Sequence, residues 1–118
     1  MYEIYFYRDE DGKAPVADFM RDLERRTDKA SRVTLKQVRQ YLDYLSALGT
    51  RAGPKIVKYL GGEIWELRPA QNRILFAAWY RGSFLLLHTF VKKTQKTPQK
   101  EMDRAKRELA DMKRRFPE

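Results

Sequence analysis

A run of lysines and hydrogen-bonding side chains follows an apolar stretch near residue 90. It reads Lys92-Lys93-Thr94-Gln95-Lys96-Thr97 and is followed by Pro98. Ammonium groups, hydroxyls and amides donate hydrogen bonds to phosphate oxygens. Thr97 and Pro98 suit the cap and the first position of a helix, whose free N–H groups also attract an anion. The segment therefore predicts a phosphate contact. The alternative is an ordinary basic loop with a helix cap.

Two arginines, Arg68 and Arg73, flank a short loop between apolar stretches. Planar guanidinium groups match two oxygens of a phosphate, so this pair suits phosphate chemistry. A four-residue loop at 69–72 makes Arg68 face Arg73 across antiparallel strands, and a two-residue turn at Gly82-Ser83 makes Arg73 face Lys92. Strand alternation then assigns one sheet face to Glu66, Arg68, Arg73, Trp79, His88 and Lys92.

This predicted face carries candidates for proton transfer and for base stacking. Lys92 lies among other cations, which makes an ammonium group give up its proton more easily. His88 is the only histidine, the side-chain type that changes charge near neutral pH. Because it lies in an apolar run, a structural role in the core is the alternative to acid or base catalysis. Trp79 is the stacking candidate, with core packing as its alternative.

The positive charge of the chain is concentrated in one segment. The net charge is +9, and residues 49–100 supply +8 of it, with ten basic residues against Glu63 and Glu66. Residues 1–48 hold nine basic and nine acidic residues, so they are neutral in sum. A basic sheet beside a neutral helical half is typical of a surface that binds polyanions, most often nucleic acid. The alternative is a solvated face that serves solubility.

Like charges that face each other across strands destabilise a sheet. Grouping Arg68, Arg73 and Lys92 on one face therefore favours an anionic ligand that neutralises them. The alternative is internal: Glu63 and Glu66 pair with the arginines while Lys92 points into solvent. The two readings predict different surroundings for the guanidinium groups.

Hydrophobic periodicity predicts an α+β fold. Residues 2–7 form a strand, Pro15 opens a first helix, and a second helix runs from about Lys29 to Leu48. An extended piece at 56–60 precedes three strands at 63–68, 72–80 and 84–92, and a last helix follows Pro98. We expect a mostly antiparallel, twisted sheet of four to five strands with two N-terminal helices and one C-terminal helix, all on one side. The apolar face under the helices collects Trp65, Leu67, Ile74, Phe76, Ala78, Leu85, Leu87 and Val91.

Composition excludes several classes of function. There is no cysteine, which excludes disulfides, thiolate metal sites and thiol catalysis. One histidine argues against a His-based zinc site, so we expect neither a metal nor a cofactor. No run approaches the length of a membrane span, and the first eleven residues lack the apolar region of a secretion signal. We expect residues 1–118 to form one cytoplasmic domain with no membrane partner.

Three segments carry a resemblance to a known family. They read Trp65-Glu66-Leu67-Arg68, Arg73-Ile74-Leu75-Phe76 and Leu87-His88-Thr89-Phe90-Val91-Lys92-Lys93-Thr94-Gln95-Lys96-Thr97-Pro98. The series resembles the RelE/ParE toxin superfamily, and more closely its HigB-type, phage-derived branch. The resemblance covers most of the chain, is most specific over residues 63–105, and implies a RelE-like fold.

The resemblance implies the toxin of a type II toxin–antitoxin system. Such toxins are mRNA endoribonucleases that enter the ribosomal A site and cleave the message there. A HigA-like helix-turn-helix antitoxin usually neutralises them, so we expect a monomeric toxin within a hetero-oligomeric complex. The exposed sides of the N-terminal helices are our candidates for antitoxin docking. Two other functions stay open: a ParE-like inhibitor of DNA gyrase, and a nucleic-acid-binding module without catalysis.

The resemblance also assigns expected roles to residues. It implies Arg68 and Arg73 in the active site and Lys92, Lys93 and Lys96 as the basic motif at the strand end. Combined with the analysis above, the expected catalytic set is Arg68, Arg73, Lys92 and His88, and the expected RNA-binding set is Lys93, Gln95, Lys96, Thr97 and Trp79. Phe116 is the only aromatic residue near the C-terminus, where some relatives use a catalytic tyrosine. The identity of the acid and the base therefore stays open.

Overall fold

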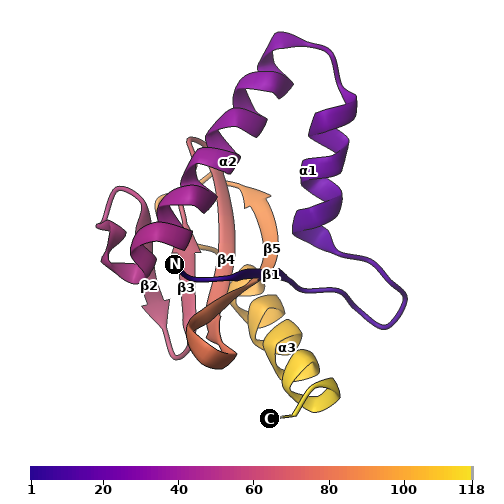
Figure 1. The fold of residues 1–118 in the computed structure, drawn as a ribbon, viewed down its shortest axis with the longest axis vertical. Coiled ribbons are helices and arrows are strands. Elements are labelled where there is room, and N and C mark those ends of the chain that lie inside the picture. The colour runs from indigo at the N-terminus through magenta and orange to yellow at the C-terminus, as the bar shows by residue number, and fades with distance from the viewer. Residues whose placement is uncertain (118) are drawn as a thin grey trace.

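The computed structural model describes residues 1–117. Within these residues, a five-stranded sheet forms the centre and three α-helices pack around it (Figure 1). The elements in chain order are β1 (Ile4–Phe6), α1 (Pro15–Arg25), α2 (Lys29–Leu48), the short 3₁₀ helix η1 (Gly49–Ala52), β2 (Val57–Gly61), β3 (Ile64–Leu67), β4 (Asn72–Trp79), the 3₁₀ turn η2 (Tyr80–Gly82), β5 (Ser83–Val91) and α3 (Gln99–Arg115). Among the described residues, no helix is both long and apolar enough to cross a bilayer.

The strand order confirms the predicted fold class. The strands lie in the order β1-β5-β4-β3-β2. The pairs β2–β3, β3–β4 and β4–β5 are antiparallel, while β1 runs parallel to β5. The structure is therefore an α+β fold with a mixed sheet, and the predicted order of helices and strands is correct.

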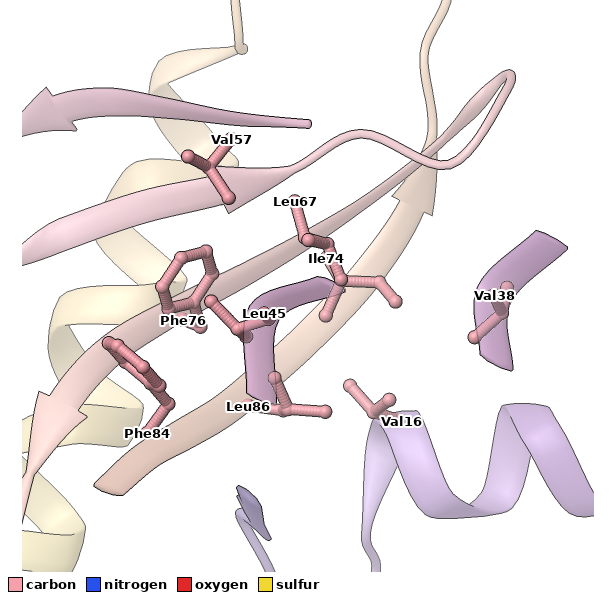
Figure 2. Packing of buried hydrophobic residues seen from close by; sticks show 9 residues of the cluster. All are labelled: Val16, Val38, Leu45, Val57, Leu67, Ile74, Phe76, Phe84 and Leu86. Atoms are coloured by element: carbon pink, nitrogen blue, oxygen red, sulfur yellow. The ribbon is translucent and has the colours of Figure 1, made fainter. Parts of the chain in front are cut away.

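The helices cover both faces of the sheet, not one face as the sequence suggested. Val16 of α1 and Val38 and Leu45 of α2 pack on one face against side chains that include Ile74 and Phe76 of β4 (Figure 2). On the other face, Ala105 and Leu109 of α3 pack against a second cluster with Leu75, Ala77, Leu85 and Leu87. The mostly buried strands β4 and β5 are apolar on both faces, which is typical of strands covered on both sides.

The register between β3 and β4 confirms one of the two predicted loops. Glu66 pairs with Leu75, as a four-residue loop between Arg68 and Arg73 requires. The β4–β5 register differs, because Arg73 faces Phe90 and not Lys92. The turn there contains three residues, with Arg81 and Gly82 at positive φ.

A β-bulge between the Leu75 and Phe76 pairs shifts the register a second time. The three-residue turn shifts the register by an odd number of residues, so Leu85 lies on the α3 face instead of the predicted α1–α2 face, and the bulge leaves Leu87 as an extra residue on the α3 face as well. Beyond the bulge, the faces of Arg73 and His88 are the predicted ones, because the remaining shift is an even number of residues.

Candidate functional site

A buried carboxylate, Glu66, lies between the two predicted arginines. Its Oε2 atom is 3.5 Å from Nε of Arg68 and 3.6 Å from Nε of Arg73. Its Oε1 atom accepts a hydrogen bond of 2.7 Å from the hydroxyl of Thr97. A single oxygen is therefore the nearest carboxylate atom to two guanidinium groups, and neither is close enough to donate a well-formed hydrogen bond to it.

Arg73 is held by the loop that precedes its own strand. Its Nη1 atom donates to the carbonyl oxygens of Ala70 and Asn72, each at 2.8 Å. The residue is only 7% exposed, and its Nε atom is buried without a hydrogen-bond partner. Burial lowers the pKa of Arg73, and the nearby carboxylate of Glu66 opposes this effect. Nε faces Oε2 of Glu66 at a distance too long for a hydrogen bond, so the guanidinium of Arg73 is incompletely hydrogen-bonded within the protein.

The segment after β5 lines an open hollow together with Arg73. The hollow has a volume of about 660 Å³ and is lined by Ala70, Gln71, Arg73, Lys92, Lys93, Thr94 and Gln95. The backbone N–H of Lys92 donates to the carbonyl of Gln71 at 2.7 Å, which fixes where the lysine leaves the sheet. Arg73, Lys92, Lys93 and Gln95 therefore meet in one place, as the sequence predicted, although Arg73 and Lys92 are not cross-strand partners.

Arg68 lies beside this hollow without lining it. Its Nη1 atom donates to the carbonyl of Pro54 at 3.0 Å, which directs the guanidinium toward the segment before β2. Lys96 is exposed on the same basic segment but does not line the hollow. Of the predicted cations, Arg73 and Lys92 therefore line the hollow, whereas Arg68 and Lys96 lie outside it.

The predicted helix cap is displaced by one residue. Helix α3 begins at Gln99 and Pro98 occupies the cap position, without a side-chain cap. Thr97 is not the cap, because its hydroxyl donates to Glu66. This bond connects the basic segment to β3, and no sequence pattern predicts it, since the two residues are far apart in the chain.

The alternative in which Glu63 and Glu66 pair with the two arginines is correct for Glu66 and wrong for Glu63. Glu66 does face both arginines, as that alternative expects. Glu63 instead pairs with Lys113 of α3, at 2.7 Å. No described acidic side chain forms an ion pair with Lys92, Lys93 or Lys96. One carboxylate therefore accompanies five cations, and a local excess of positive charge remains.

His88 lies away from the hollow, beneath α3. It is fully buried, with Nδ1 at 2.6 Å from Oε1 of Glu108 and Nε2 at 3.0 Å from Oε1 of Glu101. Glu108 also accepts a hydrogen bond from Nε of Arg104 at 3.2 Å. Both ring nitrogens are occupied by protein carboxylates, which favours the structural alternative for His88. The glutamates at 101 and 108 could be found from sequence only by placing α3 against β5.

Trp79 lies at the far end of β4 from Arg73. The two residues are six positions apart along the strand, about 20 Å. The indole stacks on the ring of Tyr80, with ring centroids 4.4 Å apart, and also packs against the cluster under α3. It shares the face of Arg73, as predicted, but does not approach the hollow. Within residues 1–117, no three acidic or histidine side chains are arranged to hold a metal ion.

The fold and the comparison with known families agree on the class of this protein. A mixed five-stranded sheet with a basic hollow at one end is consistent with the RelE-like fold. Residues 19–110 match the family described as phage-derived Gp49-like proteins (DUF891), so the chain belongs to this family of RelE-like toxins. No curated protein matches the chain.

Proposed function

We propose that this protein is the HigB-type toxin of a type II toxin–antitoxin system and acts as an endoribonuclease. Its substrate is the message in the A site of a translating ribosome, in the cytoplasm. Cleavage there arrests translation and growth. A HigA-like helix-turn-helix antitoxin would bind the toxin and block this activity. Membership of a RelE-like toxin family supports the class, and the basic hollow supports the chemistry.

The proposed reaction uses the RNA's own 2′-OH as the nucleophile. The 2′ oxygen bonds to the adjacent phosphorus while the bond from phosphorus to the 5′ oxygen breaks. A base removes the 2′ proton, and an acid protonates the departing 5′ oxygen. Charge that develops on the phosphoryl oxygens needs fixed donors, which Arg73 supplies at the hollow and Arg68 at its edge.

Within this reaction, Lys92 is our candidate for proton transfer. It lines the same hollow as Arg73, and a positioned proton-transfer group contributes roughly 10²–10⁴-fold to a rate. Lys93 and Gln95 would hold the flanking phosphates, with Lys96 on the exposed edge. Thr97 contributes indirectly, because its hydroxyl is bonded to Glu66. His88 and Trp79 have no direct part in this proposal.

The observation that carries the proposal is the incompletely hydrogen-bonded, buried guanidinium of Arg73, a residue that lines a hollow together with Lys92 and Lys93. Burying a guanidinium with incomplete hydrogen bonding costs free energy, and a phosphate in the hollow would recover part of it. A face kept only for solubility has no need of a buried cation.

The test is induction of Arg73→Ala in cells, with mapping of mRNA 5′ ends. We expect loss of growth arrest and a drop in codon-associated cleavage of roughly 10²–10³-fold, as for removal of one preorganised charge donor. Arg73→Lys retains the charge beside Glu66 but lacks the planar guanidinium that donates two parallel hydrogen bonds, so we expect a partial loss of cleavage. Arg107→Ala removes an exposed arginine of α3 and should behave like the parent.

Three results would contradict the proposal in different ways. Full toxicity of a folded Arg73→Ala protein would remove this residue from the mechanism. DNA-damage signalling without mRNA cleavage would favour gyrase inhibition. RNA binding with a steep salt dependence and no cleavage would favour a binding module.

A further inference from the structure

The helical half of the protein is neutral only in sum. Residues 1–24 hold seven acidic and three basic residues, whereas residues 25–39 hold six basic residues and one acidic residue, Asp28. This second segment has a net charge of +5 and forms the end of α1, the turn and the first half of α2. In Figure 1 it occupies the end of the molecule opposite the C-terminus.

Four of these cations form a stripe along α2. Lys29, Arg32, Lys36 and Arg39 follow one another at intervals of three, four and three residues, which places them on one side of the helix. Together they extend over about 15 Å at the rise of an α-helix. All four are exposed, whereas Leu35 and Val38 point into the protein.

The stripe has few internal counter-charges. Arg39 pairs with Glu24 of α1, at 3.3 Å. In the described part of the chain, no acidic side chain forms an ion pair with Lys29, Arg32 or Lys36. Arg32, Lys36 and Arg39 line a shallow hollow of about 500 Å³, with Asp43 at its end.

These charges are arranged against the stability of their own helix. The first turn of α2 contains the cations Lys29 and Arg32, which the helix dipole disfavours, and its one acidic neighbour is the N-cap Asp28, whose carboxylate accepts a hydrogen bond from the N–H of Ser31. Arg32 and Lys36 also repel each other at a spacing of four residues. A polyanion on this surface would relieve both effects, since the cost arises from uncompensated positive charge.

The stripe and the hollow at Arg73 are directed toward the same end of the molecule. The arrowhead of β5, after which Lys92 follows, and the turn between α1 and α2 both extend away from the C-terminus (Figure 1). Tyr41, two residues after Arg39, packs against the core and contributes to the pKa of Arg73, against the lowering by burial. The stripe lies on the other side of α2 from Tyr41, because two residues of an α-helix turn through about 200°. A flexible polyanion held at Arg73 would therefore reach the stripe by passing around this end of the molecule.

We propose that Lys29, Arg32, Lys36 and Arg39 form a second binding surface, which holds the phosphate backbone of RNA beyond the hollow at Arg73. The proposal rests on the proposed function for the identity of the polyanion as RNA. This surface binds backbone and makes no distinction among bases, because lysine and arginine on an exposed helix contact phosphates without reading base edges.

The test compares two matched double variants of the full chain. Arg32→Gln with Lys36→Gln removes one arginine and one lysine from the stripe. Lys106→Gln with Arg107→Gln removes the same charges from the exposed side of α3. Binding of a labelled 20-nucleotide polyuridylate is measured by fluorescence anisotropy over a series of salt concentrations. Circular dichroism checks that both proteins are folded.

We expect the α2 variant to bind at least tenfold more weakly at low salt than the α3 variant. Two lost phosphate contacts should also reduce the slope of log affinity against log salt by about 1.4, at ~0.7 per contact for a single strand. Equal affinities and slopes for the two variants would overturn the proposal, because they would show that only net charge matters.

A second polymer separates RNA from an acidic protein partner. Polyglutamate of similar length carries comparable charge without phosphates, and we expect both variants to bind it weakly and alike. If the α2 variant loses polyglutamate binding while it retains polyuridylate binding, the stripe is a protein-docking surface and the proposal is wrong. Since the readout is binding, a protein that binds through α2 but cleaves no message would refute only the proposed endoribonuclease activity.

Discussion

At the scale of single residues, Glu66 determines how much positive charge the hollow presents. It is 4% exposed and faces two guanidinium groups with one oxygen. A buried cation without any partner would be costly, and a fully paired one would have nothing left for a ligand. Glu66 therefore offsets part of the cost of burying Arg73, while the long contact between them leaves the guanidinium incompletely hydrogen-bonded.

His88 gives the clearest residue-level prediction. Replacing it by leucine leaves Glu108 buried with only Arg104 beside it, so we expect the free energy of unfolding to fall by about 2–4 kcal/mol. Denaturant unfolding at neutral pH measures this change. Lys92→Ala serves as the control, because its half-exposed side chain forms no ion pair within the described residues and should affect stability by about 0.5 kcal/mol or less.

Unchanged stability together with lost cleavage would instead support His88 as the catalytic acid or base. A His88→Leu protein with the stability of the parent and no cleavage activity would require a chemical role for the imidazole. The geometry argues against this outcome, since both ring nitrogens already contact glutamates of α3.

Residue types near the hollow were predictable, but their partners were not. Arg73, Lys92, Lys93 and Gln95 could be grouped because phosphate-binding types cluster where strands end. The link from Thr97 to Glu66 could not, since no local pattern connects a loop hydroxyl to a strand carboxylate.

At the scale of elements, a three-residue turn and one β-bulge account for much of the difference between expectation and structure. The alternation of side chains fixes faces only while the register is known and every residue is paired. The turn at Tyr80–Gly82 shifts the register by an odd number of residues, so Leu85 lies on the opposite face from the one predicted, and the extra residue Leu87 returns His88 to its predicted face. The run Leu85-Leu86-Leu87 is apolar throughout and offers no pattern that would locate the extra residue. Helices and strands were predictable from periodicity, whereas this irregularity depended on packing against both layers.

Helix α2 yields a stability prediction that is independent of any ligand. In the Arg32→Gln and Lys36→Gln double variant, we expect the free energy of unfolding at low salt to rise by roughly 0.5–1 kcal/mol. The gain comes from the lost repulsion and from the removal of a cation in the first turn. Denaturant unfolding at low and high salt measures it.

The salt dependence provides the control for this prediction. At about 1 M salt the screening length is ~3 Å, so the difference between variant and parent should disappear. A variant that is less stable than the parent at low salt would show that the stripe stabilises the helix, and the argument for a bound polyanion would lose its energetic basis.

At the scale of the whole molecule, a cluster of hydrogen bonds joins the two ends of the chain. Asp111 of α3 accepts hydrogen bonds from the hydroxyl of Tyr7 at 2.7 Å, from Arg114 at 2.8 Å and from Arg115 at 2.8 Å. Burial and the bond to Asp111 raise the pKa of Tyr7 to about 12, so its hydroxyl stays protonated and donates at neutral pH. This cluster ties the C-terminal part of α3 to the residue that follows β1, and so holds the helix into which the basic segment leads.

The cluster makes the stability of the fold sensitive to acid through Asp111. Hydrogen bonds from Arg115, Tyr7 and Arg114 hold the pKa of Asp111 well below its usual range in the folded protein. A carboxylate with a lowered pKa stabilises the fold above its ordinary pKa, and this contribution is lost as the pH falls toward the folded value. We therefore expect Asp111→Asn to be less stable than the parent at pH 7, and the difference between the two proteins to shrink progressively as the pH falls below about 4. Denaturant unfolding at intervals from pH 7 to pH 2 measures both curves. Curves that stay parallel throughout would mean that the carboxylate charge does not hold α3 in place, and the position of the basic segment would then need another explanation.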